Sequence, residues 1–89
     1  MKVKELLNEN TWTKGWYARD AQGNDVNYSS DNAVKWCLVG AIGKCYQDWE
    51  VKEAIFKKVV SVLGGVNYVS FNDGASWPEM HEFLEKADI

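Results

Sequence analysis

The chain has 89 residues, enough for one domain, and 46% of them are hydrophobic. Ten basic and 13 acidic residues give a net charge of −3, which argues against general nucleic-acid binding because such binding needs a basic surface. No apolar stretch is long enough for a membrane span, and the N-terminus lacks the apolar stretch of a signal peptide, so we expect a soluble, cytoplasmic protein without membrane contact.

The first predicted elements are a short helix and a hairpin. Apolar residues at helical spacing predict a helix over residues 2–9. Strand-favouring residues follow, and the turn-forming residues 20–25 separate them from a second short extended stretch. We therefore predict antiparallel strands near 15–19 and 26–28. Alternation along the first strand is expected to place Trp16 and Tyr17 on opposite faces.

A second helix is predicted over residues 33–46, after N-cap residue types at 29–32. Beside its apolar face, Cys37, Gly40 and Gly43 form a strip of small side chains. Each glycine costs about 1 kcal/mol relative to alanine within a helix, so we expect another element to approach this strip closely. A neighbouring helix is our expectation, and a bound molecule is the alternative.

The second half of the chain contains two further helical patterns. The first covers residues 49–63, after Asp48 as its cap, and its wide apolar face predicts a well-buried helix. The second covers residues 77–87, after the capping box of Ser76 and Glu79.

The stretch 66–71 between these two helices is β-prone, and it is either a third strand or an extended connection. The predicted fold is therefore a single α+β domain over residues 1–89, mostly helical. Three to four helices pack on a two- or three-stranded antiparallel sheet.

Candidate catalytic chemistry is limited to Cys37 and the only histidine, His81. A cysteine hydrolase needs a thiolate beside an imidazole that a third group orients, here Asn72 or Asp73. The predicted position of Cys37 in the middle of a helix does not favour a thiolate, so the hydrolase is the weakest alternative.

No metal or cofactor is expected. Residues 20–31 resemble a calcium loop only in part, because Asp25 stands where that loop needs glycine and Asp31 where it needs glutamate. The two cysteines lie eight residues apart on one predicted helix, too far for a disulfide, which is typical of a reducing compartment.

Aromatic residues concentrate in the first half of the chain. We expect most of them to fill a thin core and one or two to stay partly exposed. Stacking aromatics with a few polar groups also form ligand pockets, so a small-molecule site, for example for a nucleotide signal, is an alternative function. Its lining would include Trp16, Trp36, Arg19 and Asn72.

Three short motifs occur in order along the chain. They are Ala18-Arg19-Asp20-x-x-Gly23, then Trp36-Cys37-x-x-Gly40-Ala41, then Asn72-Asp73. Together they resemble a family of small uncharacterised proteins of bacteria and their phages, known as a domain of unknown function. The segment after Asp73 departs from that pattern. The resemblance implies no activity, but it marks Arg19, Asp20, Trp36, Cys37, Asn72 and Asp73 as motif residues.

A structural role is also open for these motif residues, for example an ion pair between Arg19 and Asp73. The functional hypothesis is a non-enzymatic phage or bacterial accessory protein that binds a partner protein or a small ligand. If a phage encodes it, it would act in the host cytoplasm by inhibiting a host defence or regulatory protein. The predicted binding residues are Trp16, Arg19, Asp20, Trp36, Asn72 and Asp73.

Overall fold

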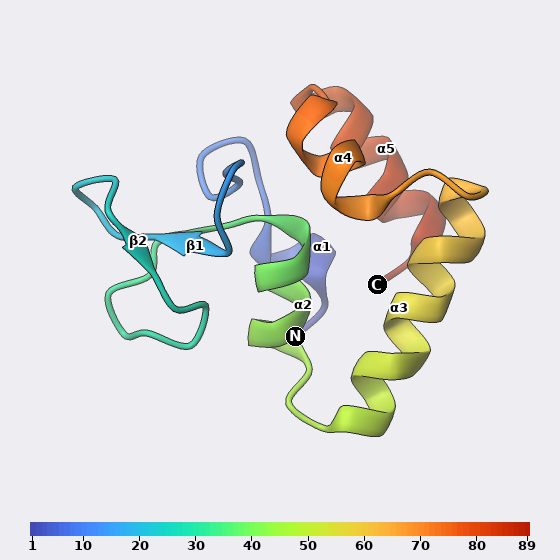
Figure 1. The fold of residues 1–89 in the computed structure, drawn as a ribbon, viewed down its shortest axis with the longest axis horizontal. Helices are drawn as coiled ribbons and strands as arrows, with labels where there is room; N and C mark the ends of the chain where they lie inside the picture. Colours follow the sequence, from blue (N-terminus) through green and yellow to red (C-terminus); the bar gives the residue numbers. More distant parts are fainter.

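The computed structural model describes all 89 residues and has five helices and three short strands (Figure 1). The elements in chain order are α1 (Val3–Leu6), β1 (Ala18–Arg19), β2 (Asp25–Val26), β3 (Lys35–Trp36), α2 (Leu38–Cys45), α3 (Trp49–Leu63), α4 (Tyr68–Gly74) and α5 (Trp77–Ala87). The predicted class, a mostly helical α+β fold with a small antiparallel sheet, is confirmed.

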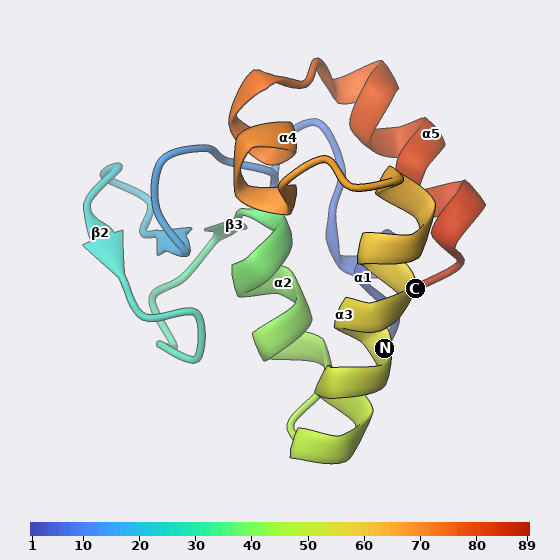
Figure 2. The same ribbon diagram turned by 45° about the vertical axis from the view of Figure 1, so that its right-hand side comes forward.

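The sheet has the strand order β2-β1-β3, and both neighbours of β1 are antiparallel to it. Ala18 at its centre lies opposite Val26 on one side and Trp36 on the other. The predicted hairpin therefore forms, with shorter strands than expected. In both views the sheet lies at one end of the molecule, and α3 and α5 lie on the far side of α2 from it (Figures 1 and 2).

The stretch 66–71, predicted as a strand or an extended connection, is instead largely helical, because α4 begins at Tyr68. Asn67 caps this helix, since its side chain accepts hydrogen bonds from the two backbone N–H groups that follow Tyr68. The helix turns Phe71 inward, where its ring lies 5.2 Å from that of Phe83 on α5. Tertiary packing and a cap therefore override the β propensity of this stretch.

The helix predicted over 33–46 begins later than expected, at Leu38. Two backbone N–H groups explain the delay, because that of Trp36 donates to the Thr11 carbonyl and that of Cys37 to the Tyr17 carbonyl. These bonds hold the chain extended, so residues 35–36 form the third strand. Cys37 is therefore the N-cap of α2 and does not lie in the middle of a helix, as predicted.

The helices α3 and α5 have the predicted boundaries. Asp48 caps α3, Gly64 ends it with a φ of +62°, and Ser76 begins α5 with the expected capping box. The prediction that α3 is well buried is wrong. Only Val59 of this helix is buried, because neighbouring helices cover one side of it only.

The core is one cluster of 14 buried apolar residues, to which α2 and α5 contribute most. The helix predicted over 2–9 forms only over Val3–Leu6, and the Asn8 side chain then accepts hydrogen bonds in a turn. The Lys4 N–H donates to the carbonyl of Ile89, so the two ends of the chain lie together.

The helices of this protein are short. None is both long enough and apolar enough to cross a membrane, although α3 and α4, bent by 64° relative to each other, together reach that length and composition.

Candidate functional site

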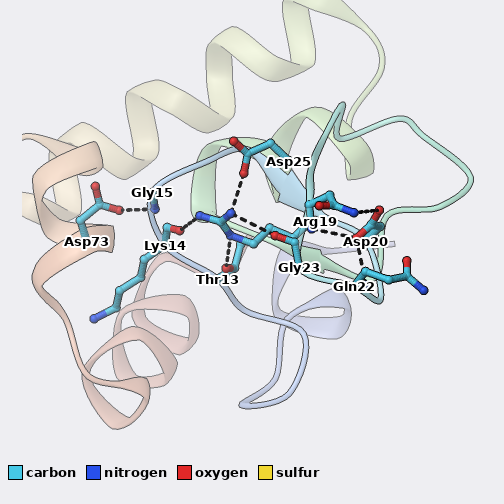
Figure 3. A network of polar contacts seen from close by, with 10 residues as sticks. Thr13, Lys14, Gly15, Arg19, Asp20, Gln22, Gly23, Asp25 and Asp73 are labelled. Carbon is cyan, nitrogen blue, oxygen red and sulfur yellow. Dashed lines mark hydrogen bonds and ion pairs between the residues drawn. The ribbon is translucent and has the colours of Figure 1, made fainter.

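Arg19 stands at the centre of a polar network in the hairpin (Figure 3). The predicted ion pair with Asp73 does not form. The guanidinium instead pairs with Asp25 at 2.5 Å and donates to the Lys14 carbonyl at 2.9 Å. Asp25 is the cross-strand neighbour of Arg19, so the register of the hairpin brings the two charges together. The guanidinium makes two further hydrogen bonds, to Thr13 and Gly23, so it stabilises the hairpin and is not free to bind a ligand.

Asp20 closes the turn of the hairpin. Its carboxylate accepts hydrogen bonds from the backbone N–H groups of Asn24, at 2.8 Å, and Gln22, at 3.0 Å. The bond from Asn24 is the main reason that the pKa of Asp20 is lowered. Asp20 is therefore a turn residue. No group of three histidine, cysteine, aspartate or glutamate side chains in the protein can hold a metal ion.

Trp36 is a packing residue. Its side chain is buried, and the indole N–H donates to the carbonyl of Tyr28 at 3.0 Å. Trp36 therefore holds the loop after β2 against the core and is not among the residues that line the clefts of the surface.

The strip of small residues on α2 is covered by the hairpin region, not by a neighbouring helix as expected. A Cβ atom on Gly40 would overlap with the carbonyl oxygen of Tyr17. A Cβ atom on Gly43 would lie 2.7 Å from the ring of Tyr28. The two glycines are thus needed because protein atoms, and no ligand, occupy the space beside them.

Asn72 is a buried polar hub, with 2% of its surface exposed. Its side-chain oxygen accepts from the indole N–H of Trp12, at 2.8 Å, and from the backbone N–H of Leu38, at 3.0 Å. Its amide nitrogen donates to the Thr13 carbonyl and to Asp73, both at 3.2 Å. One side chain thereby joins α4, the start of α2 and the loop before β1, so Asn72 is a positioning residue.

A cleft of about 250 Å³ opens beside this hub, between the loop before β1, the start of α2 and α4. We call it the aromatic cleft. Its large apolar side chains are those of Trp16, Tyr17, Val39 and Val69. The remaining lining residues are Gly15, Cys37, Asn72 and Asp73.

Trp16 and Tyr17 are the exposed aromatic residues of this cleft, with 45% and 49% of their surfaces accessible. The prediction that they lie on opposite faces is wrong, because their rings meet edge-on with 5.5 Å between the centroids. They precede β1, and the bend there frees them from the alternation of a strand. The same pair also lines a second concavity with Asp25, Val26, Asn27 and Tyr28.

Cys37 lines the aromatic cleft, but its thiol is not activated as a nucleophile. Burial raises the pKa of its thiol, and this effect outweighs the backbone N–H groups of Gly40 and Val39, which lower it. A neutral thiol at neutral pH is a weak nucleophile.

The structure does not bring His81 to this thiol. His81 is exposed on α5, with its ring 5.8 Å from that of Trp77, and it does not line the aromatic cleft. The thiol–imidazole pair of a cysteine hydrolase is therefore not formed.

Of the predicted binding residues, Trp16, Asn72 and Asp73 meet at one site, whereas Arg19, Asp20 and Trp36 serve the fold elsewhere. The sequence reasoning missed Val39 and Val69 as parts of the site. Val69 gave no signal, because it reaches the cleft only as part of a helix that was not predicted.

One family model, described as a family of unknown function (DUF6197), matches residues 1–88. No solved structure matches the chain.

Proposed function

The chain belongs to the DUF6197 family, and we propose that it is a non-enzymatic protein that binds a partner protein at the aromatic cleft. The observation that carries this proposal is the exposed pair Trp16–Tyr17 beside a concave apolar surface. Tryptophan and tyrosine are typical anchors of protein interfaces. A chain of this size needs its large apolar side chains for the core, so leaving two adjacent aromatics half-exposed favours a role in binding.

The shape of the cleft favours a protein over a small molecule. Small-molecule pockets usually enclose about 300–1,000 Å³ and bury most of the ligand. The aromatic cleft measures about 250 Å³, and Trp16, Tyr17 and Val69 on its rim remain at least 45% exposed. An open apolar site of this kind suits side chains of a partner that covers the rim as well.

The proposed biological setting is that of a bacterial or phage accessory protein in the cytoplasm, the host cytoplasm if a phage encodes it. The motif residues Arg19, Asp20, Trp36, Cys37, Asn72 and Asp73 support this setting by resemblance. The proposed effect on the partner is inhibition of a host defence or regulatory protein, because a small acidic binding domain can act by covering a surface of its target.

Affinity capture from bacterial lysate tests the proposal. The bait proteins are the natural chain, the double variant Trp16→Ala/Tyr17→Ala and the control Trp49→Ala. Trp49 is 75% exposed on α3, outside the cleft, so the control removes an exposed aromatic side chain from another surface. A partner retained by the natural chain and Trp49→Ala, and lost by the double variant, is the expected result. Equal recovery by all three proteins, or no specific partner, contradicts the proposal.

A nucleotide is the less favoured ligand. No lysine, arginine or histidine lines the aromatic cleft, and the guanidinium of Arg19 is occupied within the hairpin. Phosphate groups are usually held by such cations or by backbone N–H groups at a helix N-terminus. At the start of α2 the N–H groups of Leu38 and Gly40 already donate to Asn72 and Cys37. Titration of tryptophan fluorescence with a nucleotide panel is expected to give no saturable change, and a saturable change lost in Trp16→Ala would favour the nucleotide.

A further inference from the structure

We propose that the partner inserts an arginine side chain into the aromatic cleft, with its guanidinium against Asp73. This inference rests on the proposed function, because it names the chemistry by which the partner would be recognised. Asp73 on α4 is the only formally charged residue that lines the cleft. The cleft therefore combines apolar walls with one negative charge, which matches a cationic head on an apolar stem.

The charge of Asp73 is not neutralised within the protein. Asp73 takes part in none of the four ion pairs of the structure. The ammonium group of the neighbouring Lys14 donates to the Ala75 carbonyl and lies 5.0 Å from the centre of the Trp12 ring. Arg19 pairs with Asp25. The carboxylate of Asp73 is thus available for a positive charge from outside.

The position of this carboxylate is also fixed in advance. One oxygen of Asp73 accepts hydrogen bonds from the backbone N–H of Gly15 and from the side chain of Asn72, both at 3.2 Å. The other oxygen accepts no hydrogen bond within the protein, and it points away from Gly15 in Figure 3. Asn72 is itself held by Trp12 and the start of α2. A carboxylate that is already oriented loses little conformational freedom when a partner binds.

The apolar walls favour arginine over a smaller cation. Val39 and Val69 can cover the methylene stem, and the rings of Trp16 and Tyr17 offer a face on which a planar guanidinium stacks. Lysine would make the same charge contact but would gain less from stacking, because its ammonium group is compact and strongly hydrated.

The second concavity indicates what lies next to this arginine in the partner. It shares Trp16 and Tyr17 with the aromatic cleft and measures about 360 Å³. Its one charged residue, Asp25, is already paired with Arg19, so this side offers no free charge. A segment that crosses the aromatic pair would therefore place an uncharged residue there. The expected pattern is one arginine flanked on one side by apolar or small polar residues.

Selection from a random-peptide display library against the full chain tests the inference. The expected result is a set of peptides with arginine at one fixed position. Replacing that arginine by citrulline, which is neutral but similar in shape, should weaken the best peptide about two- to five-fold, as should Asp73→Asn in the protein. Asparagine keeps the oxygen that accepts from Gly15, so the fold of this variant is expected to persist, which circular dichroism checks.

The matched control is Glu53→Gln, which also removes one negative charge, from an exposed residue of α3 that pairs only with Lys57. This variant should bind the peptide like the natural chain. Peptides that need Trp16 and Tyr17 but bind Asp73→Asn equally well would overturn the inference and leave the proposed function intact. Arginine amide alone binding as tightly as the peptide would overturn it in favour of a small cationic ligand. Failure to select any peptide that needs Trp16 and Tyr17 would count against the inference, and the lysate experiment would then decide the proposed function separately.

Discussion

Residues 11–37 and the helix pair α3 and α5 are held in place by different kinds of contact. In the helix pair, capping side chains set both starts, and α5 contributes Met80, Phe83 and Leu84 to the core. In residues 11–37 the strands are only two residues long, and hydrogen bonds from side chains do much of the fixing, above all those of Arg19 and Asn72. The aromatic cleft lies where this polar framework meets α2 and α4, so the proposed binding site depends on a region with few regular backbone bonds.

The close approach of the Tyr17 backbone to Gly40 should show the largest effect. We expect Gly40→Ala to lower the free energy of unfolding by at least about 3 kcal/mol, because the new methyl group overlaps with the Tyr17 carbonyl, which also accepts from the Cys37 N–H. Urea unfolding measures this change. The control is Gly74→Ala at the end of α4, where no atom lies within 4 Å of the new methyl group. Similar stability of the two variants would contradict the steric explanation.

Loss of the Asn72 side chain should give the second-largest decrease in the free energy of unfolding. Asn72→Ala leaves the Trp12 indole N–H and the Leu38 N–H without an acceptor, and we expect a loss of about 2–3 kcal/mol. Chemical unfolding and the NMR signal of the Trp12 indole proton report this change. Asn32→Ala serves as the control, because the Asn32 side chain is exposed and makes no hydrogen bond in the protein. If both variants unfold at the same urea concentration, Asn72 does not organise the cleft.

Removing a helix cap in the pair α3 and α5 should lower the free energy of unfolding less than removing the Asn72 side chain does. Asp48→Ala removes the acceptor for the N–H groups of Glu50 and Val51, and we expect a loss of about 1 kcal/mol. The effect is smaller because water can reach these exposed groups. Thermal unfolding of this variant beside Asn72→Ala checks the order. A larger loss for Asp48→Ala would reverse the proposed difference between the two regions.

The contact between the chain ends gives a smaller, pH-dependent effect. Hydrogen bonds from Lys4 and Lys2 lower the pKa of Asp88 to about 2, from an ordinary value of 3.8. Because the pKa of Asp88 is lower in the folded state than in the unfolded state, its ionised carboxylate stabilises the fold at pH values above the unfolded-state pKa. This contribution is lost as the pH falls from about 4 to about 2. The difference in unfolding free energy between the natural chain and Asp88→Asn should therefore be constant near neutral pH, shrink below about pH 4 and vanish below about pH 2. A difference that persists unchanged at pH 2 would contradict this assignment.

Local signals in the sequence determined α3, α5 and the turn of the hairpin. A helix start depends on one cap and its next few residues, as at Asp48 and Ser76, and all of these are neighbours in sequence. The turn at Asp20 likewise needs only residues within four positions of it. The two strands of the hairpin could be placed from the same signal, although their lengths could not.

Tertiary structure decided the third strand and the partner of Arg19, and together with the Asn67 cap it decided α4. The strand at residues 35–36 exists because the backbone N–H groups of Trp36 and Cys37 donate to the carbonyls of Thr11 and Tyr17, which lie 25 and 20 positions earlier in the chain. The cleft has the same origin, since Trp16, Val39 and Asp73 come from three separate segments. The sequence could name Trp16, Asn72 and Asp73 as binding residues by type. It could not show that Asp73 is left without an ion-pair partner. That depends on the register of the hairpin, which places Asp25 opposite Arg19 so that these two residues form the ion pair.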